Sequence, residues 1–377
     1  MKKQFFKCLI VLLTLSINTK AQNPIYTNEK AVTIVGYTLD AMEPHLSTDG
    51  NAMFFNSLNN GINTSLHYAA KVNDTVFNYV GLVPIVNQTI TPRLDAVASL
   101  DTANNFYWVS TRTWPTIIEN LQRIRFLTAG YSNFGRVYGD FYINAPNWLI
   151  MDAAVNYYGD KLIYCNAWFN SCTGGVPCKA SMGMAQKIND STFNKMPTTN
   201  TVFAAINDTV NYIVYAPCLT KDELELYYTR LLKNGTQTEI MVASRSNTNN
   251  AFGTPTLLIG SPAIAPEAAT LTSDKSKLYF HKKMGATYKL FLRYRASVTK
   301  INEIQNKNNI IVYPNPTTDY VFVNSEEEMT LRLFSIDGTT ILSTKNNKVN
   351  LTELAKGIYF LEVRNNFINK KIKIIKN

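Results

Sequence analysis

"EPHLSTDGNAMFFNS", residues 43–57, is the first of five similar segments that decide the fold of this 377-residue chain. An alternating strand pattern leads to a polar bend at Asp49 and Gly50, and a second strand pattern ends on an aromatic pair. Asp and Gly tolerate the backbone geometry of a tight bend, and alternating apolar residues suit a half-buried sheet. The segment therefore predicts a β-hairpin that packs against a neighbouring sheet.

Four more segments align with the first one without gaps. They are "DAVASLDTANNFYWVS" from Asp95, "DAAVNYYGDKLIYCN" from Asp152, "APCLTKDELELYYTR" from Ala216 and "AATLTSDKSKLYFHK" from Ala268. Their bend positions are separated by 52, 57, 64 and 52 residues. The first four units also share a second half, a strand and a polar turn that lead to Phe77, Phe134, Phe193 and Phe252. Four strands per repeated unit are typical of a β-propeller, so we expect an all-β fold with a five-bladed β-propeller.

The fifth unit lacks this second half, which would leave an open sheet edge. An open edge invites aggregation unless another strand pairs with it. The spare strand-like segment is "AVTIVGYTL", residues 31–39. We expect it to be the outermost strand of the sheet that contains residues 268–295, so that the N-terminus closes the ring.

The five segments resemble the WD40-like (PD40) repeat of TolB-type propellers, whose core pattern is close to "EPxLSPDGxxLYFxS". The first segment matches this pattern best and the third departs from it most. The resemblance extends over approximately residues 31–298 and implies a propeller fold.

A second strand pattern follows the propeller, after the polar segment "INEIQNKNN" of residues 301–309. Residues 310–377 contain a series of short motifs: Pro314, Asn315, Pro316, Asp337, Gly338, Leu351, Leu354, Gly357 and Tyr359. In this order they resemble the type A C-terminal sorting domain of the type IX secretion system (T9SS) of Bacteroidetes, a small β-sandwich. The resemblance implies partners in the secretion machinery and its sorting peptidase. It also implies an extracellular protein, either secreted or attached to the outer-membrane surface.

The N-terminus has the pattern of a cleavable signal peptide. Lys2 and Lys3 precede an apolar run from Cys8 to Leu15, and small and polar residues lead to Ala21. No later segment approaches the about 18 uncharged residues that a transmembrane helix needs, so we expect no transmembrane segment. The expected organisation is a signal peptide (1–21), a β-propeller (22–300), a linker (301–309) and the sorting domain (310–377).

The formal net charge of +10 does not indicate nucleic-acid binding. Four lysines belong to the signal peptide, and residues 301–377 hold ten basic and eight acidic side chains. The propeller keeps about +4, without a cluster of Lys and Arg that would attract a phosphate backbone.

Four cysteines lie beyond the signal peptide, an even number that suits disulfides in an exported protein. Cys172 and Cys178 flank the turn-rich "TGGVP", so we expect them to form a disulfide. Cys165 and Cys218 would then pair by elimination. A zinc site is the alternative, but the spacings contain no CxxC pair and no histidine is close in sequence. We expect neither a metal nor another cofactor.

The alignment places three acids, Glu43, Asp95 and Asp152, at one equivalent position, with Glu267 one residue away. In a propeller this position opens the innermost strand, so the carboxylates could surround one mouth of the central channel. They could form a cation site or a glycosidase-like acid pair. The alternative, which we favour, is that each acid belongs to the hydrogen bonding of its own repeat, because the consensus of the resembled family often has Glu there.

Trp114, Trp148 and Trp168 lie in segments that we expect to be loops, whereas Trp108 lies in a strand pattern. Exposed aromatic rings can stack on sugars or peptides, and a loop tryptophan can equally fix its own loop to the blade. The sequence contains no HExxH, GxSxG, P-loop or GxGxxG motif. We therefore expect a binding protein for a glycan or a protein ligand first. A glycan-active hydrolase that uses the channel acids is the second hypothesis, and a structural component of the cell surface is the third.

Deletion of residues 308–377 should leave the propeller folded but trapped in the periplasm, because the sorting motifs lie in the deleted segment. Cell fractionation and protease accessibility in a host with a type IX system would measure this. Normal surface display of the truncated chain would refute the assignment.

Overall fold

The computed structural model describes residues 24–296 and 310–377, apart from 171–175, 234, 236, 261–263, 325–327 and 366–368. The expected signal peptide and linker therefore lie outside the described residues. The chain forms two compact units, Met1–Ala296 and Ser297–Asn377. Both are built from strands, which confirms the predicted all-β fold; the one α-helix among the described residues is the short α1 (Thr199–Val202).

The described residues of the first unit form five sheets, and each sheet is named here after its innermost strand. In the β3 sheet the order is β2 (Thr33–Val35), β7 (Val76–Leu82), β6 (Leu66–Asn73), β4 (Ala52–Asn56), β3 (Met42–Leu46). In the β8 sheet it is β11 (Tyr131–Arg136), β10 (Leu121–Phe126), β9 (Asn105–Ser110), β8 (Arg93–Leu100), with the short β5 (Asn63–Thr64) parallel to the start of β8.

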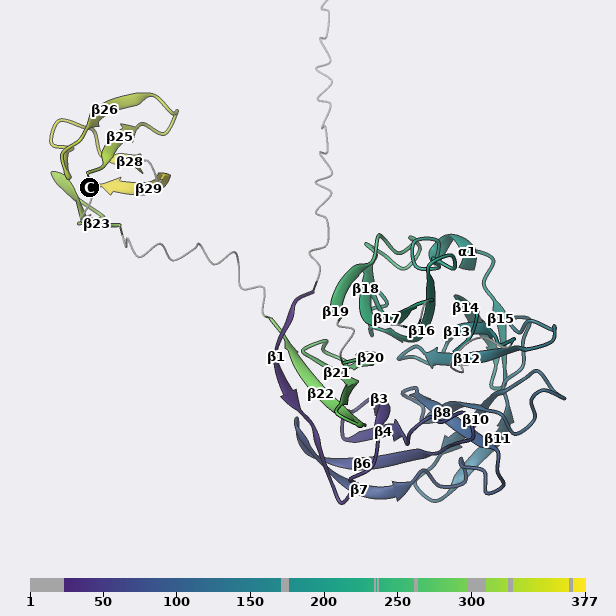
Figure 1. The fold of residues 1–377 in the computed structure, drawn as a ribbon. Coiled ribbons are helices and arrows are strands. Elements are labelled where there is room, and N and C mark those ends of the chain that lie inside the picture. Colours follow the sequence, from purple (N-terminus) through teal and green to yellow (C-terminus); the bar gives the residue numbers. More distant parts are fainter. Residues whose placement is uncertain are drawn as a thin grey trace, which may run out of the picture. The chain divides into compact units, whose positions relative to one another are not determined.

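The remaining three sheets have four strands each. The β12 sheet contains β12 (Trp148–Val155), β13 (Lys161–Trp168), β14 (Lys179–Asn189) and β15 (Thr192–Lys195). The β16 sheet contains β16 (Tyr212–Leu219), β17 (Glu225–Leu232), β18 (Thr238–Ser244) and β19 (Thr256–Gly260). The β20 sheet contains β20 (Glu267–Leu271), β21 (Lys277–Met284), β22 (Thr287–Arg295) and β1 (Tyr26–Ala31). The innermost strands are neighbours in the cyclic order β3, β8, β12, β16, β20, so that the sheets surround a common centre (Figure 1).

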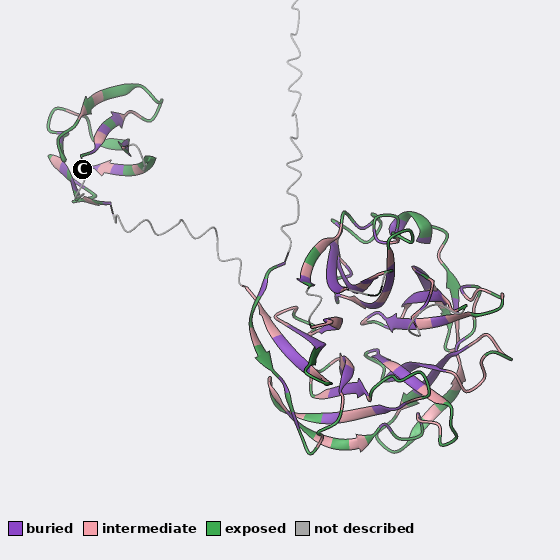
Figure 2. Cartoon of the chain, in the orientation of Figure 1, coloured by how far each residue is buried: buried purple, intermediate pink, exposed green. Residues whose placement is uncertain are grey.

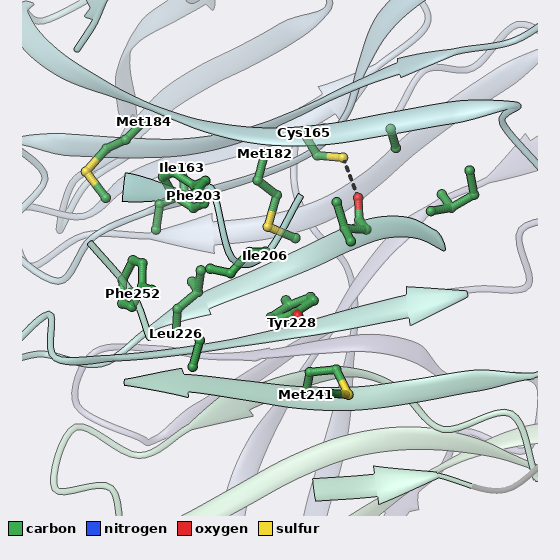
Figure 3. Close-up of a cluster of buried hydrophobic side chains, with 14 of the residues drawn as sticks. Ile163, Cys165, Met182, Met184, Phe203, Ile206, Leu226, Tyr228, Met241 and Phe252 are labelled. Atoms are coloured by element: carbon green, nitrogen blue, oxygen red, sulfur yellow. Dashed lines mark hydrogen bonds between the residues drawn. The ribbon is translucent and has the colours of Figure 1, made fainter. Parts of the chain in front are cut away.

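Apolar side chains fill the spaces between neighbouring sheets, and buried residues accordingly run along the strands (Figure 2). Between the β12 and β16 sheets, Met182 and Met184 from one side meet Leu226, Tyr228 and Met241 from the other (Figure 3). Of the four phenylalanines that end the repeat units, Phe77, Phe193 and Phe252 are buried. Phe134 differs because it lies on the edge strand β11, where 45% of its surface is exposed.

The expected pairing of Cys165 with Cys218 is wrong, because both are free. Cys165 lies in the apolar layer between the β12 and β16 sheets, and its Sγ donates to the Val214 carbonyl at 3.0 Å (Figure 3). Burial raises the pKa of both thiols, which keeps them protonated. Cys172 lies outside the described residues, so its pairing with Cys178 stays a prediction.

The N-terminus closes the ring, but not with the segment that the sequence predicted. The polar strand β1, "YTNEKA", pairs with β22 in an antiparallel register from Tyr26↔Arg295 to Ala31↔Phe291. Residues 33–35 instead form β2, which runs parallel to β7 in the β3 sheet. An outermost strand faces solvent and is therefore polar, whereas the apolar Val32 and Ile34 are buried between the β3 and β20 sheets.

Several side chains fix β1 to the β20 sheet. Glu29 forms ion pairs with Lys282 and with Arg293, and these two cations lower the pKa of the Glu29 carboxyl against the opposing effect of its burial. The hydroxyl of Tyr26 donates to the Lys275 carbonyl at 2.9 Å, and its ring packs edge-on against Tyr227 of the β16 sheet. The first strand of the unit is therefore part of its core and not a loose end.

The second unit consists of two small sheets around one apolar core. The first sheet has the order β23 (Ile311–Tyr313), β24 (Tyr320–Asn324), β27 (Lys348–Asn350). The second sheet has the order β26 (Thr340–Thr344), β25 (Thr330–Phe334), β28 (Gly357–Arg364), β29 (Asn369–Lys376). The motif residues hold this unit together. Asn315 donates to the Lys373 carbonyl and accepts from the Ile375 amide, Leu351 is fully buried, and Asp337 and Gly338 form the β25–β26 turn.

Tyr26→Ala should lower the free energy of unfolding of the first unit by about 3 kcal/mol, because a large buried ring is removed where the ring of sheets closes. Tyr131→Ala is the matched control, since Tyr131 also lies on an outermost strand but is 48% exposed. Urea unfolding of both variants measures the difference. Equal losses in the two would show that β1 does not contribute to closure.

Candidate functional site

Four of the innermost strands contain the same backbone irregularity. A residue with positive φ begins a bulge in each: Glu43 (50°), Val97 (59°), Ala216 (49°) and Ala268 (53°). A bulge places two residues opposite one on the partner strand, which turns the local side chains and amides out of the ladder. At each of the four bulges, the N–H group of the positive-φ residue points toward the preceding sheet.

Three of these N–H groups donate to side chains that follow the aromatic pair in the second strand of the preceding sheet, and the fourth, that of Ala216, donates to a side chain of the innermost strand β12. Val97 N–H donates to Asn56 Oδ1 at 3.1 Å, and Ala268 N–H donates to Thr229 Oγ1 at 2.9 Å. Glu43 N–H donates to His281 Nδ1 at 3.1 Å. In the β16 sheet, Ala216 N–H donates to the Asp152 carboxylate. The same linkage thus joins neighbouring sheets around the centre.

The innermost strands surround a narrow cavity of about 100 Å³. Its lining includes Glu43 and Asp152 and small residues such as Ala98, Ala154 and Ala269. Ligand pockets for drug-sized molecules measure about 300–1,000 Å³. The space has room for on the order of three water molecules, at about 30 Å³ each.

Three of the four candidate acids, Glu43, Asp152 and Glu267, lie near enough to repel one another, and we call this group the acid mouth. Glu43 and Asp152 line the cavity. The three acids come from three different sheets, namely the β3, β12 and β20 sheets. Burial raises the pKa of Asp152 to about 7, and burial together with repulsion from Asp152 raises the pKa of Glu267 to about 7. Burial, with repulsion from both other acids, raises the pKa of Glu43 well above its usual value. The acid mouth therefore retains protons near neutral pH.

The fourth acid, Asp95, lies elsewhere, because the gapless alignment misplaces it. The alignment matched Asp101 with Asp49, but Asp101 is the first residue after β8 and Asp49 is the third after β3, so the bulge of β8 falls at Val97, two residues after Asp95. The Asp95 carboxylate accepts hydrogen bonds from Trp108 Nε1, Arg112 Nη2 and the Gln88 amide. It is fully buried and fully paired, which indicates a structural role.

Polar groups that the sequence did not single out complete the acid mouth. Asn56 Nδ2 donates to the Glu43 carboxylate, and the Tyr215 hydroxyl donates to Glu267. Burial lowers the pKa of His281 to about 3, so its ring is neutral. Because Nδ1 accepts from Glu43, the proton lies on Nε2, 3.8 Å from the Glu267 carboxylate. The signal that could have found Asn56 and His281 is their shared position directly after an aromatic pair.

Two buried atoms of this group lack a hydrogen-bond partner among the described residues: Asp152 Oδ2 and His281 Nε2. Such atoms are uncommon in proteins, because desolvation without a partner costs about 1–3 kcal/mol. The described residues contain no cluster of three or more His, Cys, Asp and Glu side chains with a geometry suited to a metal ion.

The three tryptophans that were expected in loops lie beside the β12 sheet, but the expectation is wrong for Trp148 and Trp168, which lie at the ends of strands; only Trp114 is in a loop. Trp148, the first residue of β12, lies directly opposite Trp168, the last residue of β13. Trp114 Nε1 donates to the Trp148 carbonyl at 3.1 Å, and two hydrogen bonds between Asn120 and Ile150 fix the same loop to β12. All three rings are half-buried, and Lys179 lies 5.4 Å from the centre of the Trp168 ring. We call these three residues the tryptophan cluster.

The titration of the acid mouth predicts how stability depends on pH. The folded chain retains protons between about pH 4 and pH 7 that free carboxyl groups lose near pH 4, so the free energy of unfolding falls as the pH rises through this window. Glu267→Gln removes one of these charges and keeps an acceptor for Tyr215. It should raise the midpoint of thermal unfolding by about 2 to 4 °C at pH 8 and leave it unchanged at pH 4. The exposed Asp190→Asn is the control, and an equal change at both pH values would contradict the prediction.

Comparison with known families identifies the second unit. Residues 311–377 match the family described as "Secretion system C-terminal sorting domain". No curated protein matches the chain. No helix among the described residues has the length and apolar character to cross a membrane.

Solved structures resemble the chain at low sequence identity. A family 117 glycoside hydrolase from Zobellia galactanivorans is 10% identical, with a TM-score of 0.46, over 72% of this chain and 90% of its own. The catalytic domain of an α-L-arabinofuranosidase from Coprinopsis cinerea is 10% identical, with a TM-score of 0.41, over 72% and 96%. A putative TolB from Agrobacterium tumefaciens is 9% identical, with a TM-score of 0.29, over 89% and 81%.

Similarities at this level of identity and TM-score carry no conclusion about the activity of this chain. The sorting domain carries more information, because its match covers the whole described second unit. The chain thus ends in a type IX secretion C-terminal sorting domain, which marks it for export to the cell surface or the extracellular space.

Proposed function

We propose that this chain is an exported, noncatalytic propeller that binds a glycan on the face where β12 begins. The observation that carries the proposal is the tryptophan cluster. Residues 114, 148 and 168 are far apart in sequence, yet they meet where β12 starts and β13 ends. Half-buried indole rings provide a rigid apolar surface that loses little side-chain entropy when a ligand binds.

The cluster lies on the same side of the propeller as the acid mouth. Trp148 precedes Asp152 by four residues in β12, a distance of about 13 Å along an extended strand. A sugar chain offers apolar ring faces to indoles and hydroxyl groups to carboxylates and amides. The face therefore combines the two kinds of contact that a glycan needs. A protein ligand with an exposed aromatic or proline segment is the alternative occupant of the cluster.

The test is a glycan array with the purified full-length chain, followed by affinity measurements on the glycans that bind. Trp148→Ala and Trp168→Ala should each weaken binding by about tenfold, which corresponds to about 1.4 kcal/mol. Tyr158→Ala is the control, because this 59%-exposed aromatic lies in the turn at the other end of β12. The proposal fails if no glycan binds, or if the tryptophan variants bind as well as the control.

A glycan-active hydrolase is the second candidate, and one observation favours it. Buried carboxyls with a pKa of about 7, such as Asp152 and Glu267, have the proton affinity that general acids need near neutral pH. Release of reducing ends from a polysaccharide panel, abolished in Asp152→Asn, would support this candidate. Glycan binding without hydrolysis would exclude this candidate and support the noncatalytic function.

A further inference from the structure

Arg123 of β10 is a buried cation without a counter-charge beside it. The residue is 6% exposed, it forms no ion pair with another described residue, and its Nη1 has no hydrogen-bond partner among them. Arginine is almost never buried to this degree unless it is paired, because the removal of a charge from water is costly. Arg245 shows the usual arrangement, since it is also 6% exposed but forms an ion pair with Glu223.

A second unpartnered donor, the hydroxyl of Tyr107, lies on the same face of the sheet. Tyr107 is directly opposite Arg123 in the pairing of β9 with β10, so the two side chains are neighbours. Tyr107 is fully buried, and its hydroxyl has no hydrogen-bond partner among the described residues. Burial, followed by the charge of Asp101, raises the pKa of Tyr107 against an opposing effect of Arg123. The hydroxyl therefore stays protonated and can donate, and its electrostatic interaction with Arg123 places the two groups close together.

Gly135 provides space on the other side of Arg123. It is directly opposite Arg123 in the pairing of β10 with the edge strand β11, so Tyr107, Arg123 and Gly135 form one row across three strands. The row faces the β12 sheet, where Phe193 packs edge-on against Tyr107. A methyl group at Gly135 would have no heavy atom within 4 Å. The two unpartnered donors thus lie beside open space at the edge of the β8 sheet.

The two acids whose charges reach Tyr107 are already engaged elsewhere. The Asp101 carboxylate accepts from the amide and from the side chain of Asn105, at 2.9 and 2.7 Å. Asp190 forms an ion pair with Lys187 at 3.6 Å. Neither acid forms an ion pair with Arg123, so the charge of the guanidinium group is not balanced by direct contact with a described carboxylate.

We propose that Arg123 and Tyr107 bind an oxyanion, that is, a carboxylate, sulfate or phosphate group, in the space beside Gly135. A guanidinium group offers parallel N–H donors that match two oxygens of such a group, and the Tyr107 hydroxyl adds a further donor. The site is separate from the tryptophan cluster. Trp168 pairs with the first residue of β14, whereas Asp190 follows the last one. The inference therefore does not depend on the proposed glycan-binding function.

The first measurement is thermal unfolding of the full-length chain at pH 7. Sodium sulfate, phosphate or acetate replaces sodium chloride at constant ionic strength. At least one of the three oxyanions should raise the unfolding midpoint of the first unit by about 3 °C or more, because a ligand that binds only the folded state stabilises it. A wild-type chain that responds to none of them would overturn the proposal.

The second measurement removes the charge and keeps most of the apolar part of the side chain. Arg123→Met should abolish the response to oxyanions. In chloride alone it should unfold no earlier than the wild type, because the variant loses a buried charge that has no partner. Arg125→Met is the matched control, since Arg125 lies on the same face of β10 but is exposed, and it should keep the full response. Equal responses in the two variants would indicate a general salt effect and overturn the site.

The third measurement supplies the anion from the chain itself and applies even if Arg123→Met fails to fold. Gly135 has no positive φ, so other residues can adopt its backbone conformation. Gly135→Asp should unfold about 3 °C or more above Gly135→Asn in chloride, and it should lose the response to oxyanions. Equal midpoints of the Asp and Asn variants would show that the space does not adjoin the guanidinium group, which would also overturn the proposal.

The source of the oxyanion is tested with dextran sulfate and inorganic sulfate, compared at equal concentrations of sulfate groups. A larger rise of the midpoint with dextran sulfate, lost in Arg123→Met, would assign a group carried on a polymer. A larger rise with inorganic sulfate, lost in the same variant, would assign a free anion. A rise that persists in Arg123→Met for both probes would count against the site.

Discussion

The hydrogen bond from a bulged residue of one sheet to a side chain of the preceding sheet is the constraint on which the centre of the propeller depends. Glu43, Val97 and Ala268 donate these bonds through backbone N–H groups that their bulges turn out of the ladder. The bond sets how closely two innermost strands approach and in which register. Of the three acids of the acid mouth, Glu43 occupies such a bulge position, Asp152 accepts the bond from Ala216, and Glu267 directly precedes the bulge at Ala268.

The acid mouth lies beside these bonds, and its burial carries a cost. Glu43, Asp152 and Glu267 are drawn out of water toward one another, with no cation among the neighbours described here to balance them. Asp95 shows the contrast, because Arg112, Trp108 and Gln88 satisfy its carboxylate completely. Most buried polar groups are hydrogen-bonded, and exceptions are found at functional sites. Incomplete hydrogen bonding therefore distinguishes the acid mouth from a structural acid such as Asp95.

The sequence predicted the elements of this fold better than their connections. The hairpin pattern located the innermost strands, since apolar alternation and an Asp bend are local properties, and the sorting motifs located the second unit. The alignment misplaced Asp95 because it matched Asp101, the first residue of the β8–β9 turn, with Asp49, the third residue of the β3–β4 turn. The tryptophan cluster and the role of His281 could not be derived, because they depend on which sheets become neighbours. The polar β1 was missed because an outermost strand resembles a loop in sequence.

The position of β1 also has a consequence for how the molecule acquires its structure. The pairing of Tyr26 with Arg295 joins the beginning and the end of the first unit, so this contact has nearly the largest sequence separation that the unit allows. Such contacts slow folding, because a long loop must close before they form. Until this loop closes, β1 and the edge of β22 remain unpaired. Four of the six side chains of β1 are exposed in the folded structure, and the strand is largely polar. A polar strand has little tendency to pair with other chains while it is unpaired.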